Sequence, residues 1–306
     1  MSTAERPRRA WLPEVWLAVV AACVAVPGVL DPGSYAGVIE LQRQTWRAQD
    51  AVNLVAAVGL VLAARRASAG SPRAHLVRLG LLAWFAYCYL HLAFGARFGP
   101  LFLLYVAAAG LAGFRFLDGF VRTNLTRQTT PSRFPVRMVA IFLAVAGCGI
   151  AGLWLSEIVP GVLGLATPPN LHLGGLPNPT WVLDLGWLIP WSLATAWQLV
   201  RHHPAAHVNT VALLVLLATL SVAMLAVTPF ALAAGLGPDP VAGPQIVAFG
   251  VVFGVLGVIE AAFLRLALAG SAGASGPILR ASWWPQPADR LQAVPADPDA
   301  TRVQAG

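Results

Sequence analysis

Eight long apolar runs, separated by short stretches that carry most of the charge, constrain the fold more than any other feature of this sequence. A helix needs about 20 apolar residues to cross a bilayer, and each run is close to that length. Only 11% of the residues are charged, whereas a soluble domain has about 25%. The sequence therefore predicts an all-α membrane protein, a bundle of about eight transmembrane helices at residues 14–31, 46–64, 79–96, 99–118, 137–158, 180–200, 208–234 and 245–268.

Composition divides the chain into two parts. Residues 1–268 contain all the apolar runs and are predicted to form one polytopic transmembrane domain. Residues 269–306 are rich in Pro, Ala, Asp and Gly, a composition that favours a disordered tail because it offers little apolar surface to bury. An even number of crossings would place both termini on the same side of the membrane.

The basic residues indicate which side that is. All 20 are arginines, and most stand before the first run, after the last, or in those connections that eight crossings would place on one side. Arginine-rich loops remain in the cytoplasm. We therefore expect both termini and the tail to be cytoplasmic, and the protein to lie in a bacterial inner membrane. This placement also accounts for the net charge of +7 without a nucleic-acid partner.

Two carboxylates stand out in the stretch from Leu153 to Pro190. This stretch contains a loop rich in Pro, Gly and Asn between two apolar runs, with Glu157 just inside one run and Asp184 just inside the other. Ionisable groups are expensive in hydrocarbon, and those found there usually serve a function. Pro190 lacks a backbone N–H and is predicted to kink the helix that carries Asp184.

Further polar residues occupy the same half of the predicted bundle. Arg47, Asp50 and Asn53 follow one another at a spacing of three, which places them on one helical face. Tyr87 and His91 are four apart in the next run. If these faces turn inward, the side chains converge on a polar pocket that is open to the outside. The predicted ligand-binding residues are Arg47, Asp50, Asn53, Tyr87, His91, Glu157 and Asp184.

Structural roles for the same residues remain open. Arg47 could pair with Asp50, and Arg43 with Glu157, simply to fix the helix ends. Asp184 follows the sequence PNPTW and could sit in the first turn of its helix, where free backbone N–H groups favour a carboxylate.

Two other acidic positions lie toward the cytoplasmic side. Glu260 is predicted in the inner half of the last run, where it could neutralise, pair with another helix or belong to a translocation path. Asp118 stands three residues after Arg115 and is predicted to form a structural ion pair with it.

Metal and cofactor chemistry finds little support. There is no CxxC among the three cysteines and no HExxH. A zinc-type site would have to draw on His91, His172, Glu157 and Asp184, and His172 lies in a loop. We expect no bound metal and no cofactor.

Four segments carry a resemblance: WRAQDAVNLV, YLHLAFGARFGPLFLLYVA, LWLSEIVP and NPTWVLDLGWLIP. They resemble a family of uncharacterised multi-pass bacterial integral membrane proteins, over roughly residues 40–200. The resemblance implies a multi-pass fold and brings no activity with it.

These observations favour a small-solute, ion-coupled or proton-coupled carrier in which Asp50, Glu157 and Asp184 bind a cation or a proton. The alternatives are a membrane-embedded enzyme acting on a lipid or isoprenoid-linked substrate, and a non-catalytic assembly or sensing protein. The expected partners are the lipid bilayer and a small polar solute, a cation or a lipid ligand. The oligomeric state is left open.

Overall fold

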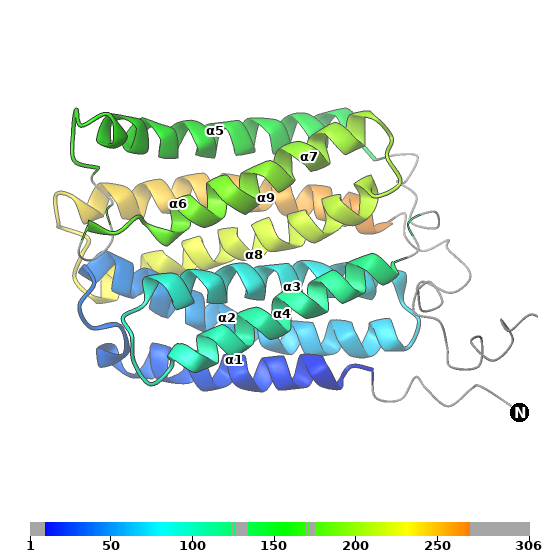
Figure 1. Ribbon diagram of the computed structural model, residues 1–306, viewed down its shortest axis with the longest axis horizontal. Coiled ribbons are helices and arrows are strands. Elements are labelled where there is room, and N and C mark those ends of the chain that lie inside the picture. Colours follow the sequence, from blue (N-terminus) through cyan, green and yellow to red (C-terminus); the bar gives the residue numbers. More distant parts are fainter. Residues whose placement is uncertain (1–9, 124, 126–133, 169–170, 172–174, 270–306) are drawn as a thin grey trace, which may run out of the picture.

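A computed structural model describes residues 10–123, 125, 134–168, 171 and 175–269. The predicted tail, apart from Ala269 at its start, lies outside these residues, and so does His172. The described part of the chain is helical, and its helices run side by side along the long axis of the molecule (Figure 1). Their order is α1 (Leu12–Leu30), α2 (Glu40–Ser68), α3 (Pro72–Gly95), α4 (Phe102–Arg122), α5 (Val136–Val162), α6 (Pro179–Leu183), α7 (Ile189–Val200), α8 (Ala206–Ala233) and α9 (Ala242–Ala269).

Seven of the described helices are long and apolar enough to cross a membrane, namely α1, α2, α3, α4, α5, α8 and α9. The predicted run at 180–200 takes a different form. It consists of α6, a π-helical turn η4 (Asp184–Leu188) and α7, which follow one another without a break. In η4 the N–H of Ile189 bonds to the carbonyl of Asp184, five residues back. The irregularity lies just before Pro190, where a bend was predicted, and π-turns of this kind often occur at functional sites.

Several helices extend beyond the apolar runs. α2 begins at Glu40, six residues before the predicted start, and α3 begins at Pro72, seven residues before it. The additional turns are polar, so hydropathy alone does not detect them. The start of α3 is set by Ser71, whose hydroxyl accepts a hydrogen bond from the N–H of Ala74. Just before α9, Asp239 accepts hydrogen bonds from the N–H groups of Ala242 and Val241, which hold the pKa of its carboxyl below the ordinary value.

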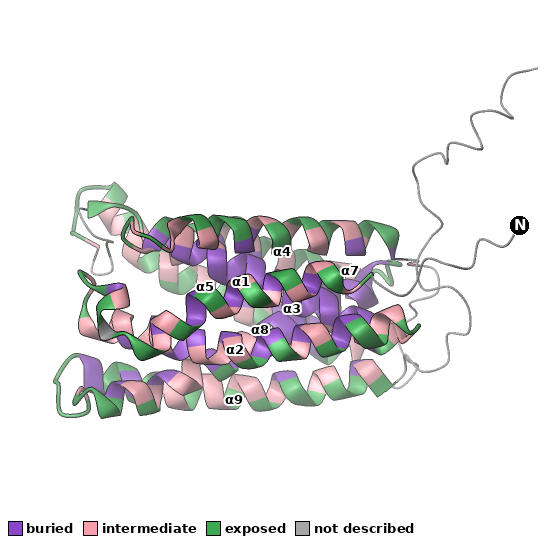
Figure 2. Cartoon of the chain, turned by 90° about the horizontal axis from the view of Figure 1, so that it is seen from below, coloured by how far each residue is buried: buried purple, intermediate pink, exposed green. Residues whose placement is uncertain are grey.

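The bundle is organised around α3 and α8. α3 packs against α2, α4 and α8, and α8 packs in addition against α2 and α9. These two helices are the most buried of the seven, whereas α9, α5 and α4 expose much of their length (Figure 2). The exposed side chains are mostly large and apolar, for example Phe114, Val145 and Val258. A soluble protein rarely exposes so continuous an apolar surface, and here it is the surface that faces lipid.

Gly80 permits the contact between α3 and α8. A Cβ atom at this position would lie 2.7 Å from the backbone oxygen of Ala212 and would overlap the side chain of Val215. The absence of a side chain therefore allows the two central helices to approach closely, as small residues commonly do in membrane bundles.

The two ends of the bundle differ in charge. We use "basic end" for the end where α1 and α3 begin and α2 and α4 finish, because it carries most of the described arginines. These are Arg65, Arg66, Arg73, Arg78, Arg115, Arg122, Arg137, Arg201 and Arg265. The opposite end carries Arg43, Arg47 and Arg97.

Candidate functional site

Asp50 lies in the first half of α2 and is fully buried, with 0% of its surface exposed. Its Oδ2 accepts a hydrogen bond from the hydroxyl of Tyr35, which stands on the short helix η1 (Pro32–Tyr35) between α1 and α2. Its Oδ1 meets no hydrogen-bond partner among the described residues. Burial, and then the adjacent Asp50 carboxyl, raise the pKa of Tyr35 well above its ordinary value, so the phenol keeps its proton and remains a donor.

Gly28 makes room for this carboxyl. It lies near the end of α1, directly over Asp50. A Cβ atom on Gly28 would overlap the Asp50 carboxyl and would come within 2.8 Å of the Tyr35 hydroxyl. Asp50 is thus enclosed by α1, η1 and α2. An alanine at position 28 would displace its carboxyl group.

Asn53 lies one turn along α2 from Asp50, on the same face, and is also fully buried. Its Oδ1 accepts a hydrogen bond of 2.8 Å from the indole N–H of Trp84, and its amide donates to the sulfur of Cys88 at 3.2 Å. The predicted polar face of α2 therefore does point into the bundle, and α3 supplies its partners.

Arg47 takes partners other than Asp50. Its guanidinium donates to the backbone oxygen of Val29 at 2.8 Å and to Gln44 at 3.2 Å, and it lies over the ring of Phe230. The structure therefore does not contain the alternative pair of Arg47 with Asp50. The guanidinium instead binds the carbonyl of Val29 at the end of α1. Similarly, Arg43 forms its salt bridge with Glu40, at 3.0 Å.

Asp184 is the centre of a second group of residues. It is 5% exposed and accepts hydrogen bonds from the Tyr87 hydroxyl at 2.7 Å and from the Trp154 indole at 2.8 Å. It does not lie in the first turn of its helix, because that helix begins at Pro179 and Asn178 is its N-cap. Asp184 instead begins the π-turn, and its two donors tie together α3, α5 and η4.

His91 lies on α3, one turn beyond Tyr87. The indole N–H of Trp46 points at its Nε2 at 3.3 Å, and Thr180 lies 3.4 Å from its Nδ1. An indole can only donate, so Nε2 accepts and the ring proton is assigned to Nδ1. The histidine therefore connects α2 to the start of α6.

Glu157 occupies a different environment from the other predicted acids. It is partly exposed near the end of α5. The bond from α5 to Asp184 comes from Trp154, three residues earlier, rather than from Glu157. The predicted residues thus form an Asp50 group between α1, η1, α2 and α3, and an Asp184 group between α3, α5 and η4. Asp50 and Asp184 are buried in this structure and are not exposed in an open pocket.

Glu260 lies between α8 and α9 and is 3% exposed. Its partner is the hydroxyl of Ser221 on α8, at 2.7 Å. Of the options that the sequence left open, the structure shows a contact with another helix. Asp50, Asp184 and Glu260 therefore share one feature, which is that each accepts a hydrogen bond from a hydroxyl group.

One buried carboxylate was missed in the sequence. Glu14 at the start of α1 is fully buried and forms salt bridges with Arg78 at 2.6 Å and with Arg115 at 3.0 Å. Glu14 stands at the edge of the first apolar run, and Arg78 directly precedes the predicted run at 79–96, so neither residue is distinguished by hydropathy. The predicted pair of Arg115 and Asp118 is confirmed, at 3.2 Å.

No group of three or more His, Cys, Asp or Glu side chains that could hold a metal occurs among the residues that the structure describes. No family model matches the chain, and no curated protein or solved structure matches it. The length and apolar character of its helices characterise a multi-pass membrane protein.

Proposed function

We propose that this protein is a carrier of the bacterial inner membrane that binds a small cation or a proton at Asp50, with Asp184 as a second carboxyl on its path. The observation that carries the proposal is the environment of Asp50. It is fully buried in the first half of a membrane-length helix, and one of its oxygens has no partner in the described part of the chain. The hydrogen bond that it accepts comes from a neutral phenol, and the side chain of Asn53, which also interacts with it, is a neutral amide.

A buried carboxyl in such surroundings requires a positive charge or a proton to offset the loss of water. Arg47 is close in sequence but is engaged by Val29 and Gln44. The unpartnered Oδ1 is therefore the atom at which we place the bound ion. In this proposal the segment α6–η4–α7 is the remaining crossing, which gives eight crossings with both termini in the cytoplasm, and the irregular backbone at η4 lines the path.

The first test is cation binding to the detergent-purified protein. We expect Na⁺, K⁺ or Li⁺, or a change of pH in choline buffer, to shift the melting temperature of the wild type. A ligand at 100 times its Kd stabilises the folded state by about 2.7 kcal/mol. Asp50→Asn should abolish the shift. Glu40→Gln is the matched control, since it makes an acid-to-amide change on the same helix at a partly exposed carboxylate that pairs with Arg43.

Gly28→Ala gives an independent check, because it displaces the Asp50 carboxyl without removing it. It should weaken cation binding by about tenfold or more, equivalent to about 1.4 kcal/mol. The separate response to alkali cations and to pH distinguishes a metal cation from a proton. Identical shifts in the wild type and in Asp50→Asn would reject the proposal and would favour a structural role for the acids.

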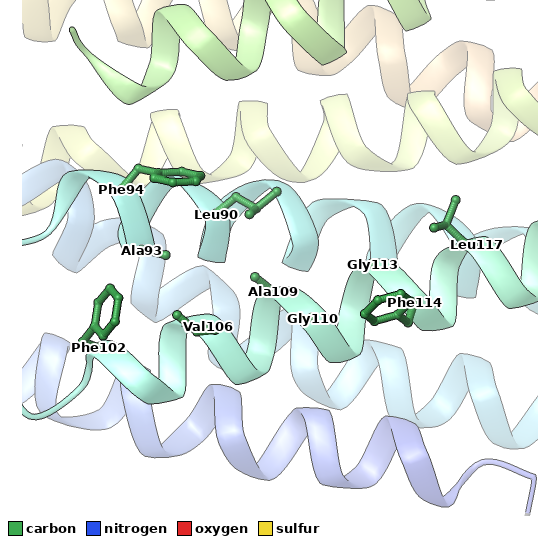
Figure 3. Close-up of a pocket in the computed structure, with 10 residues that line it drawn as sticks. All are labelled: Leu90, Ala93, Phe94, Phe102, Val106, Ala109, Gly110, Gly113, Phe114 and Leu117. Carbon is green, nitrogen blue, oxygen red and sulfur yellow. The ribbon is translucent and has the colours of Figure 1, made fainter.

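A groove on the surface favours a second candidate function, that of an enzyme acting on a lipid-linked substrate. The groove has a volume of about 510 Å³, lies between α3 and α4, and is lined by apolar side chains (Figure 3). Gly110 and Gly113 leave its floor without side chains, and Leu90 on its wall lies three residues from Tyr87, the partner of Asp184. A lipid chain in this groove would lie against α3, the helix whose Tyr87 donates to the buried Asp184.

Filling the groove tests this second function. Gly113→Phe should lower the labelling of the protein by a photoactivatable long-chain lipid in proteoliposomes by about tenfold, if the groove holds the chain with about 1.4 kcal/mol of preference over bulk lipid. The control is a Phe substitution at Gly149 on α5, where an added Cβ atom would have no atom within 4 Å. Equal labelling of both variants and the wild type would leave the groove as ordinary lipid-facing surface.

A further inference from the structure

The basic end of the bundle contains a buried ion cluster built around Glu14. Both guanidinium groups bind the same oxygen, Oε1. Arg78 donates to it from Nε at 2.9 Å and Nη2 at 2.6 Å, and Arg115 from Nε at 3.1 Å and Nη2 at 3.0 Å. The other oxygen, Oε2, is buried and has no hydrogen-bond partner among the described residues. Glu14 itself is 0% exposed.

The cluster continues from Glu14 toward the surface. Arg115 also donates to Asp118 at 3.2 Å, and Asp118 in turn binds Arg122 one turn further along α4. The side chain of Arg115 is 26% exposed, whereas that of Arg78 is 9% exposed. Arg115 therefore already divides its hydrogen bonds between the buried acid and the surface acid, and Arg78 is the fixed partner of Glu14.

Glu14 and Asp50 are connected along α1. The buried face of this helix runs from Glu14 to Gly28, the glycine that lies over Asp50. The distance along the axis is about 21 Å at 1.5 Å per residue. Leu17, Ala21 and Val24 occupy the face between them and are fully buried. The interior beside α1 thus has a carboxyl with an unpartnered oxygen at each end and an apolar seal between the two.

We propose that Glu14 is a second acceptor site for the cation or proton bound by Asp50, and that Arg115 and Arg78 form the gate that closes this site at the basic end. This inference rests on the proposed function of Asp50.

The electrostatics explain why the cluster would act as a gate. While two guanidinium groups share Oε1, their positive charge repels a cation that approaches Glu14. Transfer of Arg115 to Asp118 would remove one of these charges and would leave Glu14 with a single arginine. Asp118 then acts as the alternative partner that holds Arg115 in the open state.

The test uses a cysteine reporter on the buried face of α1. Leu17→Cys is introduced one turn from Glu14 in a variant with Cys23→Ser, Cys88→Ala and Cys148→Ser. Its rate of reaction is measured in proteoliposomes with a membrane-impermeant methanethiosulfonate cation and, separately, with a membrane-impermeant methanethiosulfonate anion, each on either side. Opening of the gate raises both rates, whereas a change of local charge moves the two rates in opposite directions. Melting temperature and gel filtration establish that each variant is folded.

Two substitutions should change the rate in opposite directions. Glu14→Gln should raise the rate about tenfold with both reagents, and from the basic end only, because the closed state loses about 1.4 kcal/mol of stability relative to the open state. Asp118→Asn should lower it below the wild-type rate, because Arg115 then has no partner in the open state. Arg66→Gln is the control, since it removes an exposed positive charge at the same end, and should leave the rate unchanged.

The gate is rejected if Glu14→Gln reacts no faster than the wild type, or if Asp118→Asn raises the rate as Glu14→Gln does. The second result would mean that any loss of charge simply loosens the helix ends. If Glu14→Gln does not fold, Arg115→Gln replaces it and should also raise the rate. Reactivity can be measured without knowing the cargo, so a failure of cation binding at Asp50 would be recognised separately.

Discussion

Gly80→Ala is expected to lower the melting temperature of the protein, although it adds only one methyl group. The new Cβ would lie 2.7 Å from the backbone oxygen of Ala212, and a backbone atom cannot rotate aside. α3 and α8 would have to separate along their length. Overpacking of this kind costs typically about 1–3 kcal/mol, against a gain of at most about 1 kcal/mol in helix propensity.

Gly113→Ala is the control for this prediction. Position 113 is also a helical glycine, but no atom lies within 4 Å of the added Cβ. Its melting temperature should equal or slightly exceed that of the wild type. The measurement is differential scanning fluorimetry in one detergent. If the two glycine variants melt together, the close contact of α3 with α8 does not limit stability.

Arg78→Met is expected to cause the larger loss of stability. It removes two of the hydrogen bonds to Glu14 and leaves this fully buried carboxylate with Arg115 alone. Removing one partner of a buried ion pair costs up to about 3–5 kcal/mol, and the pair with Arg115 that remains reduces this loss. Denaturant unfolding in mixed micelles would measure the difference.

Two further variants show whether the loss of stability in Arg78→Met comes from the buried charge of Glu14. Arg122→Met breaks the pair with Asp118, whose arginine side chain is 45% exposed, and a surface pair is worth about 1 kcal/mol or less. Glu14→Gln combined with Arg78→Met should recover part of the stability, because the buried side chain that lost its closer partner is then neutral. A single Arg78→Met variant as stable as Arg122→Met would show that Glu14 is not a buried charge.

The sequence predicted the elements of the fold better than their ends. Apolar runs locate helices because hydrocarbon requires them, and seven of the eight runs correspond to membrane-length helices. Polar first turns such as Glu40–Gln44 carry no such signal. The eighth run does contain helix, but a π-turn at Asp184 divides it, and single-sequence periodicity cannot distinguish a π-turn from an α-turn.

The sequence predicted several residues of the candidate site, but it did not predict most of their contacts. Spacing placed Asp50 and Asn53 on one face, and the structure buries both. Spacing could not identify Tyr35 or Trp154 as donors, because one comes from a connecting segment and the other from a distant helix. It also suggested a pair of Arg47 with Asp50, whereas the carbonyl of Val29, revealed only by the packing of α1, takes the arginine.

The burial of α3 has a consequence for how the chain enters the membrane. This helix contains His75, Arg78, Tyr87 and His91, which are all buried in the finished bundle. Alone in lipid these polar side chains would oppose insertion, although Arg78, close to the basic end, would cost less than the roughly 2.5–3.5 kcal/mol of a charge at a helix centre. α3 is buried in part by packing against α8, which is synthesised more than a hundred residues later. The ribosome thus completes most of the chain before α3 is enclosed, so α3 depends on α1, α2 and α4 to remain inserted during translation.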